Sequence, residues 1–150
     1  MIALLVFQIF MQLPIGVREV KATSCQVIPV YLSPGLTTQL IFEQAPVLSL
    51  HADDQHFKVH TNEAAPRSIA IIPNVDGSTI AQLFPQAPGM PPTIPSAKEL
   101  VRKLDQNLRT NLFVFFKKSN QLMFELRFVE KSKADYIIHI KQSFSQECVL

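Results

Sequence analysis

Two stretches near the end of the chain decide the fold: Leu112-Phe113-Val114-Phe115-Phe116 and Gln121-Leu122-Met123-Phe124-Glu125-Leu126-Arg127-Phe128. In the second stretch large apolar residues alternate with polar ones and with Met123, which is the period-two pattern of a strand with one buried face. The first stretch is apolar on both faces. One of its faces must join the core, and a helix, a second sheet or a partner must cover the other.

The length of the turn between these two strands decides which face of the first one is buried. A two-residue turn at Ser119-Asn120 would pair Phe115 with Phe124, whereas a three-residue loop would pair Val114 with Phe124. A shift of one residue moves every side chain to the opposite face of the sheet. The sequence is compatible with both registers.

The rest of the chain is typical of short strands separated by turns. Apolar or alternating runs occupy residues 27–31, 37–43, 47–50, 56–61, 68–72 and 134–142. One helix is expected at about residues 97–106, because Ser96 and Glu99 form a capping box before apolar residues at helical spacing. The predicted fold class is all-β: an antiparallel β-sandwich with one short covering helix and a long proline-rich loop.

The proline-rich loop spans residues 74–95. It contains five prolines, and Phe84, Met90 and Ile94 lie among them. Proline fixes the backbone and lacks the N–H that a β-ladder requires, so this segment cannot be a central strand. Loops of this length are either functional or passive. If the loop is functional, Phe84, Met90 and Ile94 are candidate contacts to a partner, together with Phe113 and Phe116.

Residues 1–22 are interpreted as a signal peptide or signal anchor, and residues 23–150 as a single sandwich domain. The run from Met1 to Val17 is apolar, and Val20-Lys21-Ala22 offers small residues at the right spacing for cleavage. No stretch reaches the ~18 consecutive apolar residues of a membrane span. A buried first strand or helix is the competing interpretation. The signal-peptide interpretation predicts a periplasmic or otherwise exported protein, with peripheral or no membrane contact.

The chain has two cysteines, Cys25 and Cys148. In an oxidising compartment they can form a disulfide that closes a long loop of the unfolded chain. Two separate thiols are the alternative, and their spacing alone does not decide between them.

Composition and motifs argue against an enzyme. The chain is 47% hydrophobic and 17% charged with a net charge of +2, which is too apolar for a disordered protein and too weakly basic to indicate a nucleic-acid partner. No phosphate loop, nucleophile elbow or zinc-protease helix is present, and no cofactor is expected. A hydrolase or metal site around His51, Asp53 and Asp54 is the minor alternative. His56 and His60 lie about 13 Å apart on one strand, too far to share a metal.

Three stretches together resemble one family, the TrbG-type periplasmic ring subunits of conjugation and type IV secretion core complexes. They are Asn111–Phe116, Leu122–Val129 and Ala134–Ile138, and an opening turn at Ser33-Pro34-Gly35 before residues 37–42 is also similar. The resemblance covers about half of the chain and implies an N-terminal β-domain with no catalytic residues. It also implies a second β-domain, for which this sequence has no counterpart.

The sequence therefore predicts a non-enzymatic, exported assembly protein. Its partners are expected to be proteins of the cell envelope, including further copies of itself in a ring. The alternative is a β-sandwich that binds a small ligand or peptide beneath the proline-rich loop.

Overall fold

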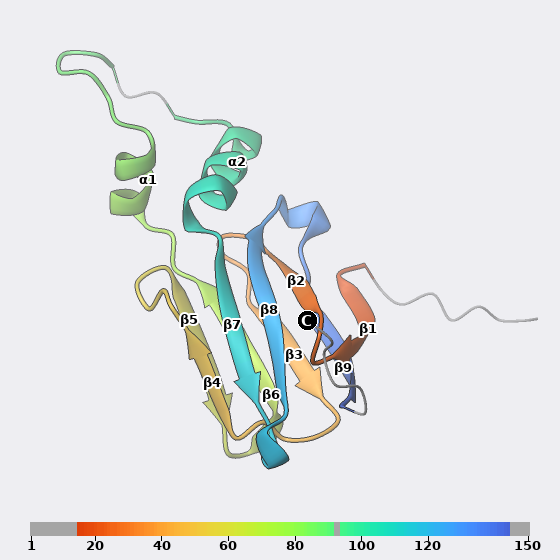
Figure 1. The fold of residues 1–150 in the computed structure, drawn as a ribbon. Helices are drawn as coiled ribbons and strands as arrows, with labels where there is room; N and C mark the ends of the chain where they lie inside the picture. Colours follow the sequence, from red (N-terminus) through yellow and green to blue (C-terminus); the bar gives the residue numbers. More distant parts are fainter. Residues whose placement is uncertain (1–14, 92–93, 145–150) are drawn as a thin grey trace, which may run out of the picture.

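The computed structural model describes residues 15–91 and 94–144. It shows a mainly β protein in which two mixed sheets, of five and four strands, pack together and two short helices are added (Figure 1). The larger sheet has the strand order β1–β9–β3–β6–β5, with bounds Val17–Thr23, Ile137–Ser143, Thr38–Phe42, Ala65–Pro73 and Phe57–Asn62. The smaller has the order β2–β8–β7–β4, with bounds Val27–Leu32, Gln121–Phe128, Thr110–Phe115 and Leu48–His51.

The expectation of purely antiparallel sheets is wrong. Three pairs run parallel: β1 with β9, β3 with β9, and β2 with β8. The cause is that the chain changes sheet after β1, β2, β3, β4, β6 and β8, so consecutive strands often become members of different sheets. Alternation in sequence shows which face of a strand is buried, but it does not show the direction of the neighbouring strand.

The β7–β8 hairpin adopts neither of the two registers expected. Leu112 lies opposite Phe124 and Val114 opposite Leu122, and residues 116–120 form the connection. This loop is longer than expected because Lys118 and Ser119 both adopt left-handed backbone conformations (φ 63° and 60°) around the short 3-10 turn Lys117–Ser119. The register buries Leu112, Val114 and Phe116 and leaves Phe113 and Phe115 on the outer face.

The core lies between the sheets and consists of the inward-facing residues of nearly every strand. Its largest fully buried side chains include Phe42, Phe57, Phe124, Leu126 and Ile138. Phe42 packs edge-on against Phe124 from the opposite sheet, with ring centroids 6.1 Å apart. Burial of such aromatic rings is the main source of stability of a sandwich this size.

The predicted domain boundary between residues 22 and 23 falls within β1. This strand pairs with β9 from Val17 to Thr23, and its Ala22 is fully buried. Gly16 precedes it with a φ of +81° and accepts backbone hydrogen bonds from Tyr136 and Ile137. A sandwich that began at residue 23 would therefore lack one strand of the larger sheet.

Asp135 joins three strands from both sheets. Its carboxylate accepts hydrogen bonds from Arg18 Nε (2.8 Å) and Nη2 (3.0 Å) in β1 and from the Tyr31 N–H (2.8 Å) in β2. Its carbonyl oxygen accepts one from Thr38 Oγ1 (2.6 Å) in β3. Arg18 also donates to the Pro29 carbonyl and lies over the Tyr31 ring. The strand expected from residue 134 begins only at Ile137, because Asp135 forms hydrogen bonds to strands of both sheets.

The proline-rich segment leaves the sandwich between two helices, α1 (Gly77–Leu83) and α2 (Ala97–Leu108), and extends away from the sheets (Figure 1). Helix α1 was not expected from the sequence, whereas α2 confirms the predicted helix, with Ser96 as its cap. Asp105 fixes α2 to β8 by accepting from Arg127 Nη2 (2.9 Å) and from the Phe128 N–H (3.1 Å). We call Asp76–Ser96 the arm.

Replacing Asp135 by Asn is expected to lower the free energy of unfolding by about 3 kcal/mol, because Arg18 is left without its counter-charge in a partly buried place. Urea unfolding measures the loss. The exposed Lys141–Glu19 pair (3.1 Å) provides the control, since Lys141→Gln should cost less than about 1 kcal/mol. Equal effects of the two substitutions would contradict the role assigned to Asp135.

Asp105 should make stability depend on acidity. Burial alone would raise the pKa of its carboxyl, but hydrogen bonds from Arg127, Arg109 and the Phe128 N–H outweigh burial and hold that pKa below its usual 3.8. A lowered pKa stabilises the folded state above the unfolded value, and this contribution disappears as the pH falls through the folded value. Asp105→Asn should therefore cost about 1–3 kcal/mol at neutral pH and progressively less in acid.

Urea unfolding at a series of pH values measures this convergence, with the exposed Glu63→Gln as the control variant. A deficit in Asp105→Asn that stays constant down to strongly acidic pH would contradict the assignment.

Candidate protein-binding surface

The outer face of the four-stranded sheet carries a continuous line of apolar side chains. In the observed registers Val27 lies beside Met123, Met123 beside Phe113, and Phe113 beside Leu50. This line, which we call the outer apolar row, crosses all four strands. Leu50 exposes 52% of its surface, Val27 as much, and Phe113 and Met123 are half-buried. Large apolar patches on one face of a soluble protein indicate a binding site.

Two further apolar residues extend the row on one side. Phe115 and Leu48 lie opposite each other in the next register position, and Leu48 exposes 51% of its surface. On the other side of the row a hollow of about 420 Å³ is lined by Val27, Met123 and Ala52 together with polar residues Arg109, Thr110, Asn111 and Glu125. The surface thus has an apolar centre with a polar margin, which is the usual anatomy of a protein interface.

The outer face of the five-stranded sheet is different. Its rows mix apolar with polar or charged positions, with Glu19 beside His139 and His139 beside Ile41 in one row, and Lys21 beside Lys141 in another. Lys141 forms an exposed ion pair with Glu19. We therefore expect this face to contact water, whereas the outer face of the four-stranded sheet is expected to contact a partner.

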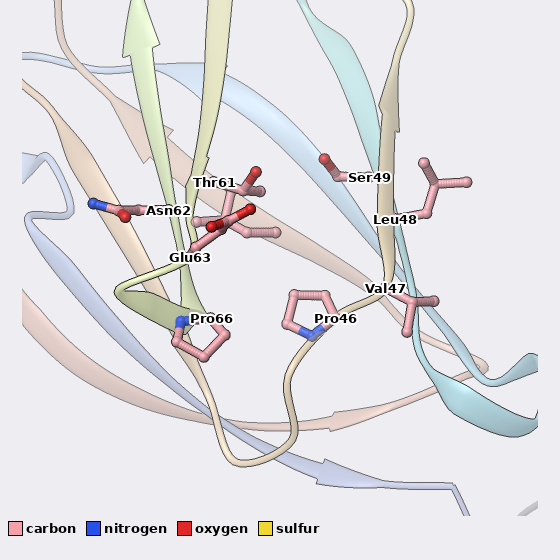
Figure 2. A pocket seen from close by; sticks show the side chains of 9 residues that line it. Pro46, Val47, Leu48, Ser49, Thr61, Asn62, Glu63 and Pro66 are labelled. Atoms are coloured by element: carbon pink, nitrogen blue, oxygen red, sulfur yellow. The ribbon is translucent and has the colours of Figure 1, made fainter.

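A groove of about 420 Å³ opens between strand β4 and the β5–β6 hairpin, at the open side of the sandwich (Figure 2). Ser49 points into it toward Thr61, whereas Leu48 points away, to the outer face (Figure 2). Pro46 and Pro66 lie on opposite sides of its lower end, and the fully buried Ile69 also lines it. Strand β4 therefore has one side chain row toward the groove and the other on the exposed face.

The predicted partner contacts lie in three different places. The prediction that Phe116 is an exposed contact is wrong, because its side chain is only 2% exposed. Its ring packs between those of Phe42 and Phe144, with centroid distances of 5.4 Å and 5.3 Å. Phe113 lies at the centre of the outer apolar row. Phe84 is half-buried at the end of α1, with Lys103 Nζ 5.9 Å from its ring centroid.

Met90 and Ile94 lie in the arm and are exposed by 67% and 91%. The arm and the outer apolar row are separate features of the structure, and the sequence did not distinguish them. It also missed Val27, Leu48 and Leu50. The alternation Leu48-Ser49-Leu50-His51 was the available signal, but a four-residue run does not show whether its leucines face the core.

The histidine and aspartate cluster separates into two pairs. His51 Nε2 lies 2.9 Å from Asp54, and His56 Nδ1 lies 2.9 Å from Asp53. Burial raises the pKa of Asp53, but hydrogen bonds from the backbone and side chain of His56 outweigh burial and lower that pKa overall. Within residues 15–91 and 94–144, no three His, Cys, Asp or Glu side chains are grouped closely enough to hold a metal ion.

Cys25 lies in the turn between β1 and β2 and is disulfide-bonded. Its predicted partner, Cys148, is outside the described residues, so the pairing of these two cysteines stays a prediction.

In the part of the chain that the structure describes, neither helix has the length and apolar character required to cross a bilayer. No protein-family model matches the chain, and no curated protein is significantly similar to it.

Substitution of Phe113, within β7, and of Phe116, directly after it, should distinguish a surface position from a core position. Phe116→Ala is expected to cost about 3–5 kcal/mol, since it empties a packed aromatic site. Phe113→Ala should cost about 1 kcal/mol, because much of its ring already contacts water. Thermal or urea unfolding measures both, and the assignment fails if Phe113→Ala is the more destabilising change.

Proposed function

We propose that this chain is a non-enzymatic, exported protein that assembles with itself or with other proteins of the cell envelope. The observation that carries the proposal is the outer apolar row, which crosses a whole sheet with half-exposed side chains. Exposing such a row to water is unfavourable by roughly 25 cal/mol for each square ångström of apolar surface. A partner that covered it would recover this free energy.

The composition of the row suits protein recognition. A phenylalanine and a methionine lie at its centre, between the branched side chains of Val27 and Leu50. Aromatic residues and methionine are enriched in interfaces, and charged residues are depleted from their centres. Arg109 and Glu125, which line the hollow beside the row, lie at the margin, where polar groups fix orientation.

The arm supports the same function as a second contact. It holds Met90 and Ile94 in solvent on a proline-rich segment whose backbone is partly fixed before binding. A segment with few conformations loses little entropy when it is bound. Assembly as a periplasmic ring subunit of the TrbG type, which the sequence resemblance implies, is part of this proposal.

Site-specific photocrosslinking in the cells that produce the protein tests the proposal. A photoreactive amino acid at Met123, in the middle of the outer apolar row, should give adducts with a second copy or another envelope protein. The matched control is the same amino acid at His139, which is exposed in the centre of the other sheet. Cell fractionation of the same samples determines whether the protein is exported.

Adducts at residue 123 that exceed those at residue 139 would support the proposal. Equal yields at both positions, or none at residue 123, would overturn it.

Ligand binding beneath the proline-rich segment is a second candidate, favoured by one observation. A hollow of about 340 Å³ lies between α1 and α2 and is lined by Phe84, Pro85, Ile94 and Pro95 with Glu99 and Lys103. Apolar walls with two charged groups are the usual composition of small-molecule sites. Binding of a small molecule that Phe84→Ala abolishes and Phe113→Ala leaves unchanged would favour this function.

A further inference from the structure

Strand β4 is an edge of the four-stranded sheet that is protected against pairing only by its short length of four residues. Proteins protect sheet edges with short strands, charged side chains, prolines or bulges. The edge strand β1 carries Arg18, Glu19 and Lys21, and β2 contains Pro29. The edge strand β5 carries Lys58 and a register irregularity at Thr61/Asn62. The sequence of β4, Leu48-Ser49-Leu50-His51, has no charge and no proline, and its pairing with β7 is regular.

A basic turn and an acidic turn lie near opposite ends of β4, with Glu63 also near the basic end and Arg109 near the acidic end. Asp53 and Asp54 follow its C-terminal end, and the side chain of Asp54 is 90% exposed. The turn that contains Lys117 and Lys118, both exposed, lies near its N-terminal end, because Leu48 is opposite Phe115 and the Val47 N–H donates to the Phe115 carbonyl (2.8 Å). A second β4 that runs antiparallel would bring an acidic end beside a basic end on both sides.

We propose that β4 pairs with β4 of a second copy, so that two four-stranded sheets become one continuous sheet across a twofold axis. The proposal rests on the proposed function, since it names the second copy as the partner beside the outer apolar row. An isologous contact of this kind is the commonest way for one chain to form a closed dimer.

The pleat restricts the register of this pairing. Residues opposite each other in an antiparallel pair lie on the same face, so Leu48 must face Leu50 or a residue of equal parity. The register that centres on the axis places Ser49 opposite Ser49 of the partner subunit and Leu48 opposite Leu50 of the partner subunit. The two outer apolar rows then meet at the axis and form one surface.

The charged ends add orientation to this contact. In the centred register the acidic turn of one copy lies about two strand spacings, ~10 Å, from the basic turn of the other. This separation slightly exceeds the Debye length of about 8 Å at physiological salt, so the attraction favours the antiparallel over the parallel arrangement mainly at lower salt. The pairing would also place the second copy across the mouth of the groove between β4 and the β5–β6 hairpin.

Light scattering with size-exclusion chromatography on the purified full chain tests the contact. A concentration-dependent dimer is expected, and Leu50→Lys should raise its dissociation constant about tenfold or more, because it introduces a charge into the joined apolar row. The matched control is His139→Lys on the exposed outer face of the five-stranded sheet, which should leave the dimer unchanged. Circular dichroism confirms that each variant is folded.

A cysteine at the axis gives an independent measurement. Ser49→Cys should form a disulfide-linked dimer on mild oxidation, seen on a non-reducing gel, and His139→Cys, on the outer face of the other sheet, should not. A chain that stays monomeric at every concentration, with no Ser49→Cys dimer, would overturn the pairing. If photocrosslinks at residue 123 to another protein persist in that case, the proposed function stands and only the identity of the partner is wrong.

Discussion

The carboxylate of Asp135 is the constraint on which the arrangement of the sheets depends. It receives Arg18 from the first strand and the Tyr31 N–H from the second, which belong to different sheets, and its own carbonyl holds Thr38 from the third. The carboxylate is satisfied only when the first two strands are in place, and the carbonyl only when the third is. The position of these three strands relative to one another, and with it the junction of the two sheets, depends on Asp135.

The sequence predicted the β character, most strand positions and helix α2, because these follow from alternation and from a local cap at Ser96. It did not predict the parallel pairs, because strand direction depends on contacts between residues far apart in the chain, such as Val17 and Ile137. Helix α1 was missed because it spans only seven residues beside a proline-rich segment. The hairpin register was missed because Lys118 and Ser119 adopt conformations that are uncommon for residues other than glycine.

The candidate site was predicted only in part, for a reason of parity. Phe113 and Phe116 are three positions apart and therefore lie on opposite faces of an extended segment, so no single surface could include both. The structure assigns Phe116 to the core and Phe113 to the outer face. The remaining residues of the outer apolar row come from strands far apart in the chain, and only the sheet order shows that they are neighbours.

The pairing of β1 with β9 has a consequence for how the chain acquires its structure. The first strand obtains its only described neighbour from residues 137–143, and β2 obtains its only described neighbour from β8, whereas β3 pairs with β6 as well as with β9. Such distant contacts impose a large loop-closure entropy and slow folding. During synthesis β1 and β2 must wait until most of the sequence has emerged. Both sheets therefore stay incomplete for an extended period, and an incompletely folded chain would suit the export that we propose.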